Sequence, residues 1–188
     1  MEKMKKCSER LVYREFEKDD YEYFKSIFSN SEVMKYTYMD VLSTEEALKD
    51  YFNNILERSK TQNKRKAYEY AVFNADRGEY IGFADVEITY VDQEVRYGEI
   101  GYFLLPEHWG KGYASEIANK LLEICFTELK LYKVVASCNA ENKPSEKVMI
   151  KVGMKKDGEL RKERFKNGKW YNELKYSILA EEWMGNIL

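Results

Sequence analysis

The turn between a strand and the longest helix of the chain constrains the fold most. Residues 113–129 carry a wide apolar stripe at helical spacing, so they predict a long amphipathic helix. Residues 95–105 predict a strand before it, and Gly110 and Gly112 stand between the two elements. Glycine permits the tight turn that such a change of direction needs. Because the helix must bury its stripe, we expect it to pack on a sheet.

Shorter signals predict the rest of the architecture. Ser43 followed by Glu46 has the pattern of a capping box, and Asn142 can cap a later helix. Asn167-Gly168 predicts a two-residue hairpin turn. The predicted elements in chain order are strand 10–14, a helix after Asp20, a helix after Ser43, strands 67–74, 79–91 and 95–105, helix 113–129, strand 132–138, a helix from Asn142 to Gly153, and two strands around the final turn.

This order predicts an α/β fold in which one mixed sheet is flanked by helices. The segment NADRG at 74–78 predicts a hairpin turn, whereas the turn near Val91–Gln93 has a weaker signal. No linker and no internal repeat interrupts the pattern. We therefore expect residues 1–188 to form a single domain.

The composition excludes several classes of protein. Hydrophobic residues make up 44% and charged residues 34% of the 188 residues, which is the profile of a globular chain. A net charge of -2 gives no strong attraction to nucleic acid or to an anionic membrane. The chain has no apolar window long enough for a membrane span and no signal-peptide pattern at its start. Three cysteines without a CxxC pattern favour a reducing compartment, so we expect a cytoplasmic protein.

The segment Trp109–Ala114, WGKGYA, combines the features of an anion site. Backbone N–H groups of a glycine turn and the positive end of a helix would point into one concavity, and Lys111 would add a full charge. We interpret it as a pyrophosphate cradle, although a tight turn that binds nothing fits these residues equally well. It is neither a Walker A loop, since GK[ST] is absent, nor a complete dinucleotide fingerprint, since the third glycine is missing. His108, the only histidine, is expected to be a surface or turn residue, and no metal site is expected.

Four separated blocks, in the right order, resemble the GNAT acetyltransferases and, among them, the branch that acetylates the N-termini of ribosomal proteins. They are RLVYREFEKDDYEYFKSIFSNSEVMKYT near the start, EIGYFLLPEHWGKGYASEIANKLLEICF in the centre, ENKPSEKVMIKVGMKKDG after it, and NGKWYNELKYSILAEEW near the end. The resemblance implies the GNAT fold, a mixed, mostly antiparallel sheet of about seven strands flanked by helices. It also implies that the fourth and fifth strands splay apart and hold acetyl-CoA in the gap.

The resemblance assigns binding residues by position. Phe103, Leu104 and Leu105 would offer backbone groups to the pantetheine arm of acetyl-CoA. Asn142 and Ser145 match an N-x-x-S motif that contacts this arm and its thiol end. The pyrophosphate would lie against a continuous run of residues, namely Trp109, Gly110, Lys111, Gly112, Tyr113, Ala114 and Ser115.

The implied reaction is the direct attack of a neutral amine on the thioester carbonyl, which needs a base and a proton donor. Glu99 matches the family's frequent glutamate in E-I-G-Y and is the predicted base, although a salt-bridged strand glutamate is an equal alternative. The tyrosine that commonly serves as the acid is replaced by Met149, so Ser145 is the predicted substitute. Ser145 could instead only cap its helix or bind the cofactor. Strand alternation places Glu99 and Phe103 on one face but does not identify that face.

The acceptor is the least determined part of the reaction. We expect a primary amine, first of all a protein N-terminal α-amine, as in the resembled branch. The alternative is a small amine such as a polyamine, an amino acid or an antibiotic-like compound, because GELRKERFKNGKW at 158–170 is similar to a pattern of polyamine enzymes. The basic residues of this segment argue against a strongly cationic acceptor. A non-catalytic acetyl-CoA-binding module is a third interpretation; a monomer and a homodimer both fit, and no nucleic acid or membrane partner is expected.

Overall fold

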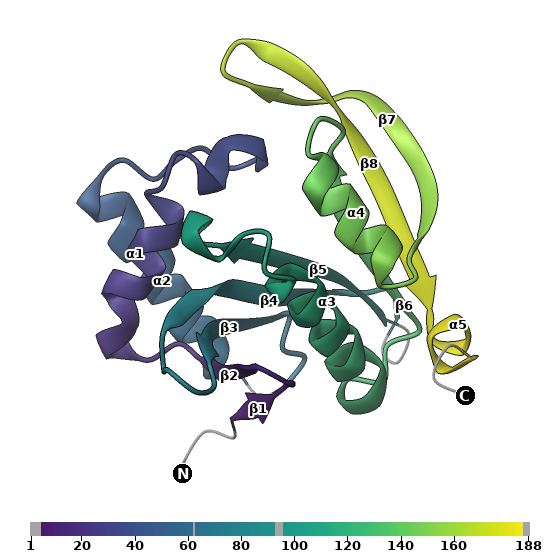
Figure 1. Cartoon of the computed structure of the whole chain (residues 1–188), viewed down its shortest axis with the longest axis horizontal. Coiled ribbons are helices and arrows are strands. Elements are labelled where there is room, and N and C mark those ends of the chain that lie inside the picture. The colour runs from purple at the N-terminus through teal and green to yellow at the C-terminus, as the bar shows by residue number, and fades with distance from the viewer. Residues whose placement is uncertain (1–4, 62, 93–95, 186–188) are drawn as a thin grey trace.

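The structure is a computed structural model that describes residues 5–61, 63–92 and 96–185. One twisted sheet of eight strands has the order β1-β2-β3-β4-β5-β6-β8-β7, with helices on both faces (Figure 1). Neighbouring strands pair antiparallel except β5 and β6, which are parallel. The strand that the sequence did not predict is the two-residue β1. The strands are β1 Lys6–Cys7, β2 Leu11–Glu15, β3 Ala67–Asn74, β4 Tyr80–Tyr90, β5 Arg96–Leu104, β6 Lys133–Asn139, β7 Lys155–Lys166 and β8 Lys169–Leu179.

The helices lie close to their predicted positions, with one correction at α2. The capping box predicted at Ser43 is wrong by one residue, because Thr44 is the N-cap and its hydroxyl accepts a hydrogen bond from the Ala47 N–H. The helix predicted over 113–129 consists of α3 and a π-helical turn, Ile124–Glu128, that continues its buried stripe. The last helix, α5, had no predicted counterpart. The helices are α1 Tyr21–Phe28, α2 Glu45–Ser59, α3 Tyr113–Glu123, α4 Lys143–Lys151 and α5 Ala180–Gly185.

Two predicted hairpin turns are confirmed. In the first, the Gly78 N–H donates to the Asn74 carbonyl, and the Asn74 side chain accepts from two of the N–H groups between them. In the second, Asn167 and Gly168 have φ angles of 50° and 76°, the positive values that a two-residue hairpin turn requires. The turn predicted near Val91–Gln93 extends outside the described residues.

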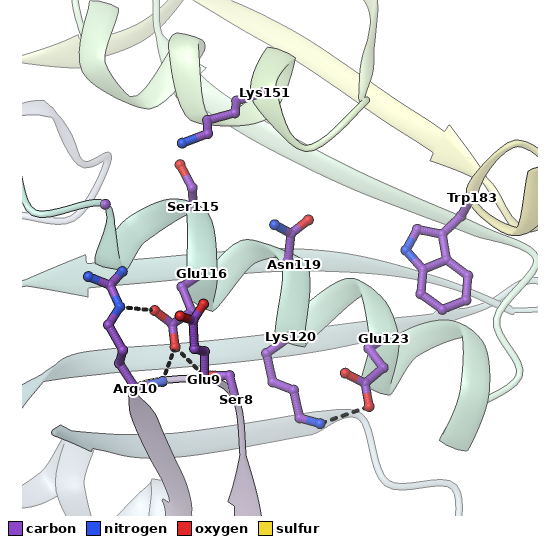
Figure 2. A pocket seen from close by; sticks show the side chains of 11 residues that line it. Ser8, Glu9, Arg10, Ser115, Glu116, Asn119, Lys120, Glu123, Lys151 and Trp183 are labelled. Atoms are coloured by element: carbon purple, nitrogen blue, oxygen red, sulfur yellow. Dashed lines mark hydrogen bonds and ion pairs between the residues drawn. The ribbon is translucent and has the colours of Figure 1, made fainter. Parts of the chain in front are cut away.

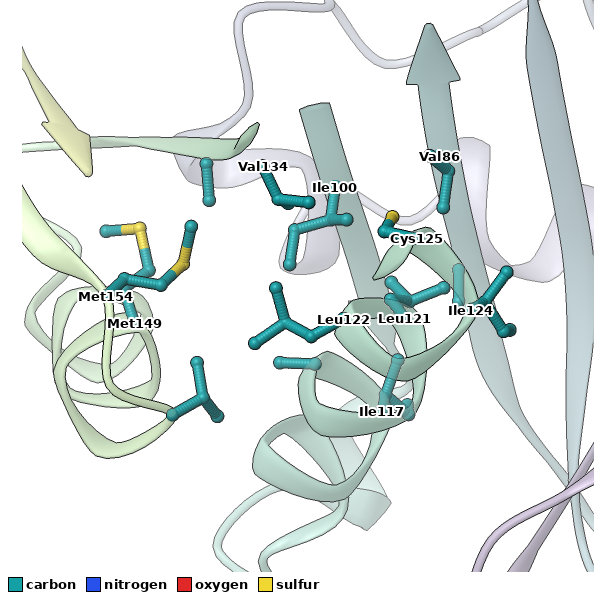
Figure 3. Close-up of a cluster of buried hydrophobic side chains, with 14 of the residues drawn as sticks. Val86, Ile100, Ile117, Leu121, Leu122, Ile124, Cys125, Val134, Met149 and Met154 are labelled. Atoms are coloured by element: carbon teal, nitrogen blue, oxygen red, sulfur yellow. The ribbon is translucent and has the colours of Figure 1, made fainter. Parts of the chain in front are cut away.

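Each face of the sheet carries its own hydrophobic core. The core under α3 and α4 contains aliphatic and sulphur-containing side chains, among them Ile117, Leu121, Leu122, Cys125, Met149 and Met154 (Figure 3). The core under α1 and α2 is rich in aromatic rings, among them Phe16, Phe24, Phe28, Phe52 and Phe83. On β5, Leu104 belongs to the first core and Phe103 packs against the second. Because strand residues alternate between faces, Glu99 shares the α1 and α2 face with Phe103.

The parallel strands β5 and β6 stay together only at their beginnings. Residues Tyr97–Glu99 lie opposite Lys133–Val135, and the pairing stops there. Beyond this point β5 continues along β4 to Leu104, while β6 continues along β8 to Asn139. The two strands therefore separate, which is the splay expected between the fourth and fifth predicted strands.

Three further features concern possible membrane spans, metal sites and thiols. Among the described residues, no helix has the length and apolar character that a membrane crossing requires. The described part of the chain also holds no group of His, Cys, Asp and Glu side chains arranged for a metal ion. Cys7, Cys125 and Cys138 are free thiols, and the last two are buried.

Candidate active site

The loop between β5 and α3 has the geometry of an anion cradle. The short turn Pro106–His108 leads into it, and the Trp109 indole N–H donates to the Leu104 carbonyl at 2.9 Å. Gly110 and Gly112 have φ angles of 73° and 82°, a left-handed conformation that favours glycine. Gly112 is the N-cap of α3 and has no side chain to cap it, so the first N–H groups of the helix have no intrahelical partner. An anion here would meet these N–H groups and the positive end of α3.

Arg10, just before β2, contacts both the loop and the first turn of α3. Its Nη1 donates to the Lys111 carbonyl at 3.1 Å, and its Nε pairs with the Glu116 carboxylate at 2.8 Å. The guanidinium also lies 4.6 Å from the centre of the Tyr113 ring. Burial acts to raise the pKa of Glu116, but hydrogen bonds from Ser8 and Arg10 lower it below its usual value. Sequence reasoning missed Arg10, because no motif marks it and it lies 101 positions from Lys111.

A groove of about 680 Å³ runs from the cradle along the outer side of α3 (Figure 2). Gly112 and Ser115 line it at the start of α3, Lys151 of α4 lies across from them, and Trp183 of α5 lines it further along. Figure 2 shows the Ser115 hydroxyl and the Lys151 ammonium group pointing toward each other. Small-molecule sites commonly measure about 300–1,000 Å³, so the groove has room for a nucleotide. Lys151 supplies positive charge suited to its phosphates, whereas Arg10 and Lys120, which also line the groove, are paired with Glu116 and Glu123.

The backbone of β5 beyond its pairing with β6 partly faces the gap between these strands. The Leu105 N–H donates to the Ile81 carbonyl at 3.1 Å, on the β4 side. Alternate residues of an antiparallel strand turn their backbone groups to opposite sides, so Leu104 and Tyr102 turn theirs toward the gap. Among the predicted pantetheine contacts, Leu104 therefore has its backbone groups on the side of the gap. Phe103 and Leu105 turn theirs toward β4.

Ser145 and Tyr102 bring two hydroxyl groups together on the α3 and α4 side of this gap. The Asn142 side chain accepts a hydrogen bond from the Ser145 N–H at 3.2 Å, which confirms the predicted cap of α4. The Ser145 Oγ lies 3.4 Å from the Tyr102 hydroxyl, and burial raises the pKa of Tyr102 to about 12. Met149, at the position of the common tyrosine, is buried in the core. Sequence reasoning missed Tyr102. The signal that could have found it is its place in the E-I-G-Y motif, on the opposite face of the strand from Glu99.

Glu99 lies on the opposite face of β5 and is exposed. Ser137 of β6 donates to the Glu99 Oε1 at 2.9 Å, and the Lys175 Nζ donates to the Ser137 Oγ at 3.0 Å. The bond from Ser137 therefore crosses from β6 to β5 where the two strands begin to separate. The structure does not bring the two predicted catalytic residues together, since Glu99 and Ser145 flank β5 from its two faces.

Three more carboxylates share the face of Glu99, namely Glu87, Asp85 and Glu69. Glu69 is buried and paired with Arg58, and Asp85, Glu87 and Glu99 together are called the carboxylate face below. Glu87 lies directly opposite Glu99 in the register of β4 and β5, and Asp85 lies opposite Gly101. A Cβ on Gly101 would overlap the Asp85 Oδ1, so the glycine leaves room for this carboxylate over β5. Burial, followed by the charges of Glu87, Glu69 and Glu99, raises the pKa of Asp85 well above its ordinary value. The raised pKa favours the protonated carboxyl in the free protein, and a bound cation would instead favour the carboxylate, because it relieves the repulsion between neighbouring like charges.

His108 has a structural position beside the cradle. It lies in a turn, which agrees with the expectation of a surface or turn residue, and it is only 3% exposed. Its Nε2 lies 3.1 Å from the Tyr80 carbonyl of β4. The ring therefore anchors the start of the cradle to the sheet.

Known proteins are similar to this chain in sequence and in fold over nearly its whole length. Residues 10–155 match the family model of the acetyltransferase (GNAT) domain. The uncharacterized N-acetyltransferase YnaD of Bacillus subtilis (strain 168) is 38% identical over 176 residues, which cover 94% of this chain and 97% of YnaD. The spermidine N(1)-acetyltransferase of Escherichia coli (strain K12) is 28% identical over 171 residues, which cover 91% of this chain and 87% of that enzyme. A solved GNAT-family acetyltransferase from Bacillus anthracis has a TM-score of 0.78 at 33% identity, over 95% of this chain and 99% of that one.

The matches extend over nearly the whole chain. They confirm the fold and the family that the four sequence blocks indicated. The chain belongs to the GNAT family of acetyltransferases and is an N-acetyltransferase that uses acetyl-CoA as its co-substrate.

Proposed function

We propose that the acceptor is a small amine with more than one positive charge, such as a polyamine, and that it binds at the carboxylate face. The observation that carries this proposal is the position of Asp85, Glu87 and Glu99 on adjacent strands of one face. A polycation would relieve the repulsion between these carboxylates. The similarity to a spermidine acetyltransferase supports the same class of acceptor.

The basic closing hairpin argues less strongly against such an acceptor than its sequence suggests, because several of its cations are paired with carboxylates. Ion pairs join Lys155 to Glu182, Lys156 to Glu159, Lys169 to Glu141, and both Arg164 and Lys175 to Glu173. Their positive charge is therefore compensated locally. These partners lie elsewhere in the chain or across the hairpin, so the basic residues of the segment alone do not reveal them.

The two substrates would bind on opposite faces of β5. Acetyl-CoA supplies the activated acyl group, and the cradle, the groove and the Leu104 backbone would hold it from the α3 side. The amine would approach from the carboxylate face, where Glu99 would take its proton directly or through water. As the amine nitrogen bonds to the carbonyl carbon, the carbon–sulphur bond breaks, and Ser145 or Tyr102 would protonate the departing thiolate. The Tyr102 N–H would polarise the carbonyl from the gap.

The competing acceptor is the N-terminal α-amine of a protein, which the resemblance to the ribosomal branch predicts. A protein N-terminus carries one positive charge on a bulky partner, so it would use Glu99 and leave Asp85 and Glu87 without a cationic partner. We also propose that residues 1–188 form one domain, since both cores pack on the same sheet. A cytoplasmic location belongs to the proposal as well, because free cysteines are typical of a reducing compartment.

Thiol release from acetyl-CoA over a panel of amines tests the acceptor class. The panel contains spermidine, a diamine, a monoamine of similar length and a peptide with a free N-terminus. We expect kcat/KM to fall about tenfold or more when a charge is removed from the amine. Turnover of the peptide alone would contradict the proposal in favour of the N-terminal acceptor. Calorimetric binding of acetyl-CoA without turnover of any amine would identify a binding module.

Two variants test whether the acceptor binds at the carboxylate face. Glu87→Gln should weaken turnover of spermidine more than turnover of the monoamine, because only the polyamine has a second charge for Glu87. Glu163→Gln changes an exposed glutamate of the closing hairpin and is the matched control. Equal losses for both amines in Glu87→Gln would count against a polyamine site.

A further inference from the structure

A buried lysine joins two segments that lie far apart in the sequence. Lys166 is the last residue of β7 and is 9% exposed. Its Nζ lies 2.7 Å from the Met34 carbonyl, 2.9 Å from the Thr37 carbonyl and 2.5 Å from the Met39 carbonyl, all in the loop between α1 and α2. In Figure 1 the hairpin of β7 and β8 extends past α4 toward this loop. The tip of the closing hairpin is therefore tied to the N-terminal part of the chain.

The contacts of Lys166 use the full donor capacity of its ammonium group. Lysine has three N–H donors, and three carbonyls surround them, with the Thr37 hydroxyl at 3.3 Å as a further acceptor. Burying a cation costs free energy unless hydrogen bonds compensate it, and the loop carbonyls supply that compensation. Removing the ammonium group would take a donor from each of the three carbonyls and release the hairpin tip.

The tied segments are linked to the carboxylate face by a chain of contacts that starts at Arg164. Arg164 pairs with Glu173, which also pairs with Lys175. Lys175 donates to Ser137, and Ser137 donates to Glu99. The Arg164 guanidinium lies 4.5 Å from the centre of the Tyr38 ring and forms an ion pair with Glu173. Tyr38 stands in the sequence between two residues that Lys166 holds, Thr37 and Met39. Partial desolvation raises the pKa of Tyr38, and the charges of the carboxylate face raise it further. The contacts from Tyr38 through Arg164 and Glu173 therefore lead to Glu99 of the carboxylate face.

We propose that Lys166 is a specificity-determining residue that limits the size of the acceptor. By fixing the hairpin tip on the loop, it holds Tyr38 and Arg164 beside the carboxylate face. A compact polyamine fits next to these residues, whereas a bulky amine has to displace a segment that is tied down. The inference rests on the proposed function, because it concerns how the same acceptor position discriminates between amines. Lys166 acts through Tyr38 and Arg164, so its role is to position them.

The variant Lys166→Met tests this role, because methionine keeps the apolar stem and lacks the ammonium group. Lys169→Met, at an exposed lysine of the same hairpin, is the matched control. Thiol release is measured with spermidine and with a spermidine that carries a bulky N-alkyl group. We expect Lys166→Met to reduce the preference for spermidine about tenfold, through the KM of the amines, with an unchanged affinity for acetyl-CoA. Hydrogen exchange of residues 33–42 should be faster in Lys166→Met than in Lys169→Met.

A second variant keeps the test decisive if Lys166→Met is too unstable to assay. Tyr38→Ala leaves the lysine contacts in place and removes the ring, so it should relax the preference for spermidine in the same way. Unchanged selectivity in a folded Lys166→Met protein, or in Tyr38→Ala, would overturn the inference and leave the proposed function intact. A wild-type enzyme that acetylates no polyamine would overturn the proposed function itself.

Discussion

A substitution at Gly101 would displace the Asp85 carboxylate and leave all three carboxylates of the carboxylate face in the protein. Gly101 lies on β5 opposite Asp85 of β4, and a Cβ there would overlap the Asp85 Oδ1. To restore an ordinary contact of 3.4 Å, the carboxylate must move by about 1 Å. Because the obstructing atom is the end of a side chain, Gly101→Ala should displace the carboxylate and leave the strand pairing intact.

We expect Gly101→Ala to weaken binding of the acceptor and to leave the stability of the fold nearly unchanged. A hydrogen bond between a carboxylate and an ammonium group contributes about 1.5–3 kcal/mol, so breaking it should lower kcat/KM for spermidine about 10- to 150-fold. Alanine restricts the unfolded chain, which stabilises the fold by about 0.4–1 kcal/mol and offsets a repacking cost of about 1 kcal/mol. The free energy of unfolding should therefore change by less than about 1 kcal/mol.

Thiol release, calorimetry with acetyl-CoA and urea denaturation separate these effects. Gly158→Ala is the control, because a Cβ at that position meets nothing within 4 Å. Gly82→Ala is the contrast, because its Cβ would overlap the Phe103 backbone, which cannot turn aside, so stability itself should fall. An unchanged kcat/KM for spermidine in a folded Gly101→Ala protein would refute the role of Asp85 in acceptor binding.

Three further predictions concern pH, the proton donor and the cradle. Burial and then the neighbouring carboxylates raise the pKa of Asp85 well above its ordinary 3.8, so its contribution to stability is complete below about pH 4 and is lost as the pH rises through the raised value. The Tm of the wild type should fall relative to that of Asp85→Asn over this window, and a constant difference would contradict the shift. Tyr102→Phe removes the hydroxyl beside Ser145 and should lower kcat about 10- to 100-fold with little change in acetyl-CoA affinity; an unchanged kcat would exclude Tyr102 as the donor. Gly112→Val puts a β-branched residue at a φ of 82° and should abolish calorimetric binding of acetyl-CoA, whereas unchanged affinity would refute the cradle.

Features encoded by a few neighbouring residues were predictable. The spacing of Gly110 and Gly112 determined the turn into α3, and Asn142 caps α4 as its position indicated. The error at Ser43 has the same local origin, because Thr44 beside it also carries a hydroxyl that can cap the helix. Local patterns thus locate a feature, but they do not choose between adjacent residues of similar chemistry.

The carboxylate face could not be predicted, because it depends on strand register and on which helices cover each face of the sheet. Alternation groups Glu99 with Phe103, but only the aromatic core under α1 and α2 identifies the face they share. The position of Asp85 opposite Gly101 depends on the register of two strands. The tie through Lys166 has no sequence pattern at all, since it joins residues 127 to 132 positions apart.

A crystal structure of the protein with CoA and spermidine would test the central claim most directly, namely that co-substrate and acceptor approach β5 from opposite faces. We expect the pyrophosphate to contact the N–H groups of residues 110–115 on the α3 side. A spermidine nitrogen should lie within hydrogen-bond distance of Asp85 or Glu87 on the α1 and α2 side. Spermidine bound on the α3 and α4 face, away from these carboxylates, would contradict the mechanism.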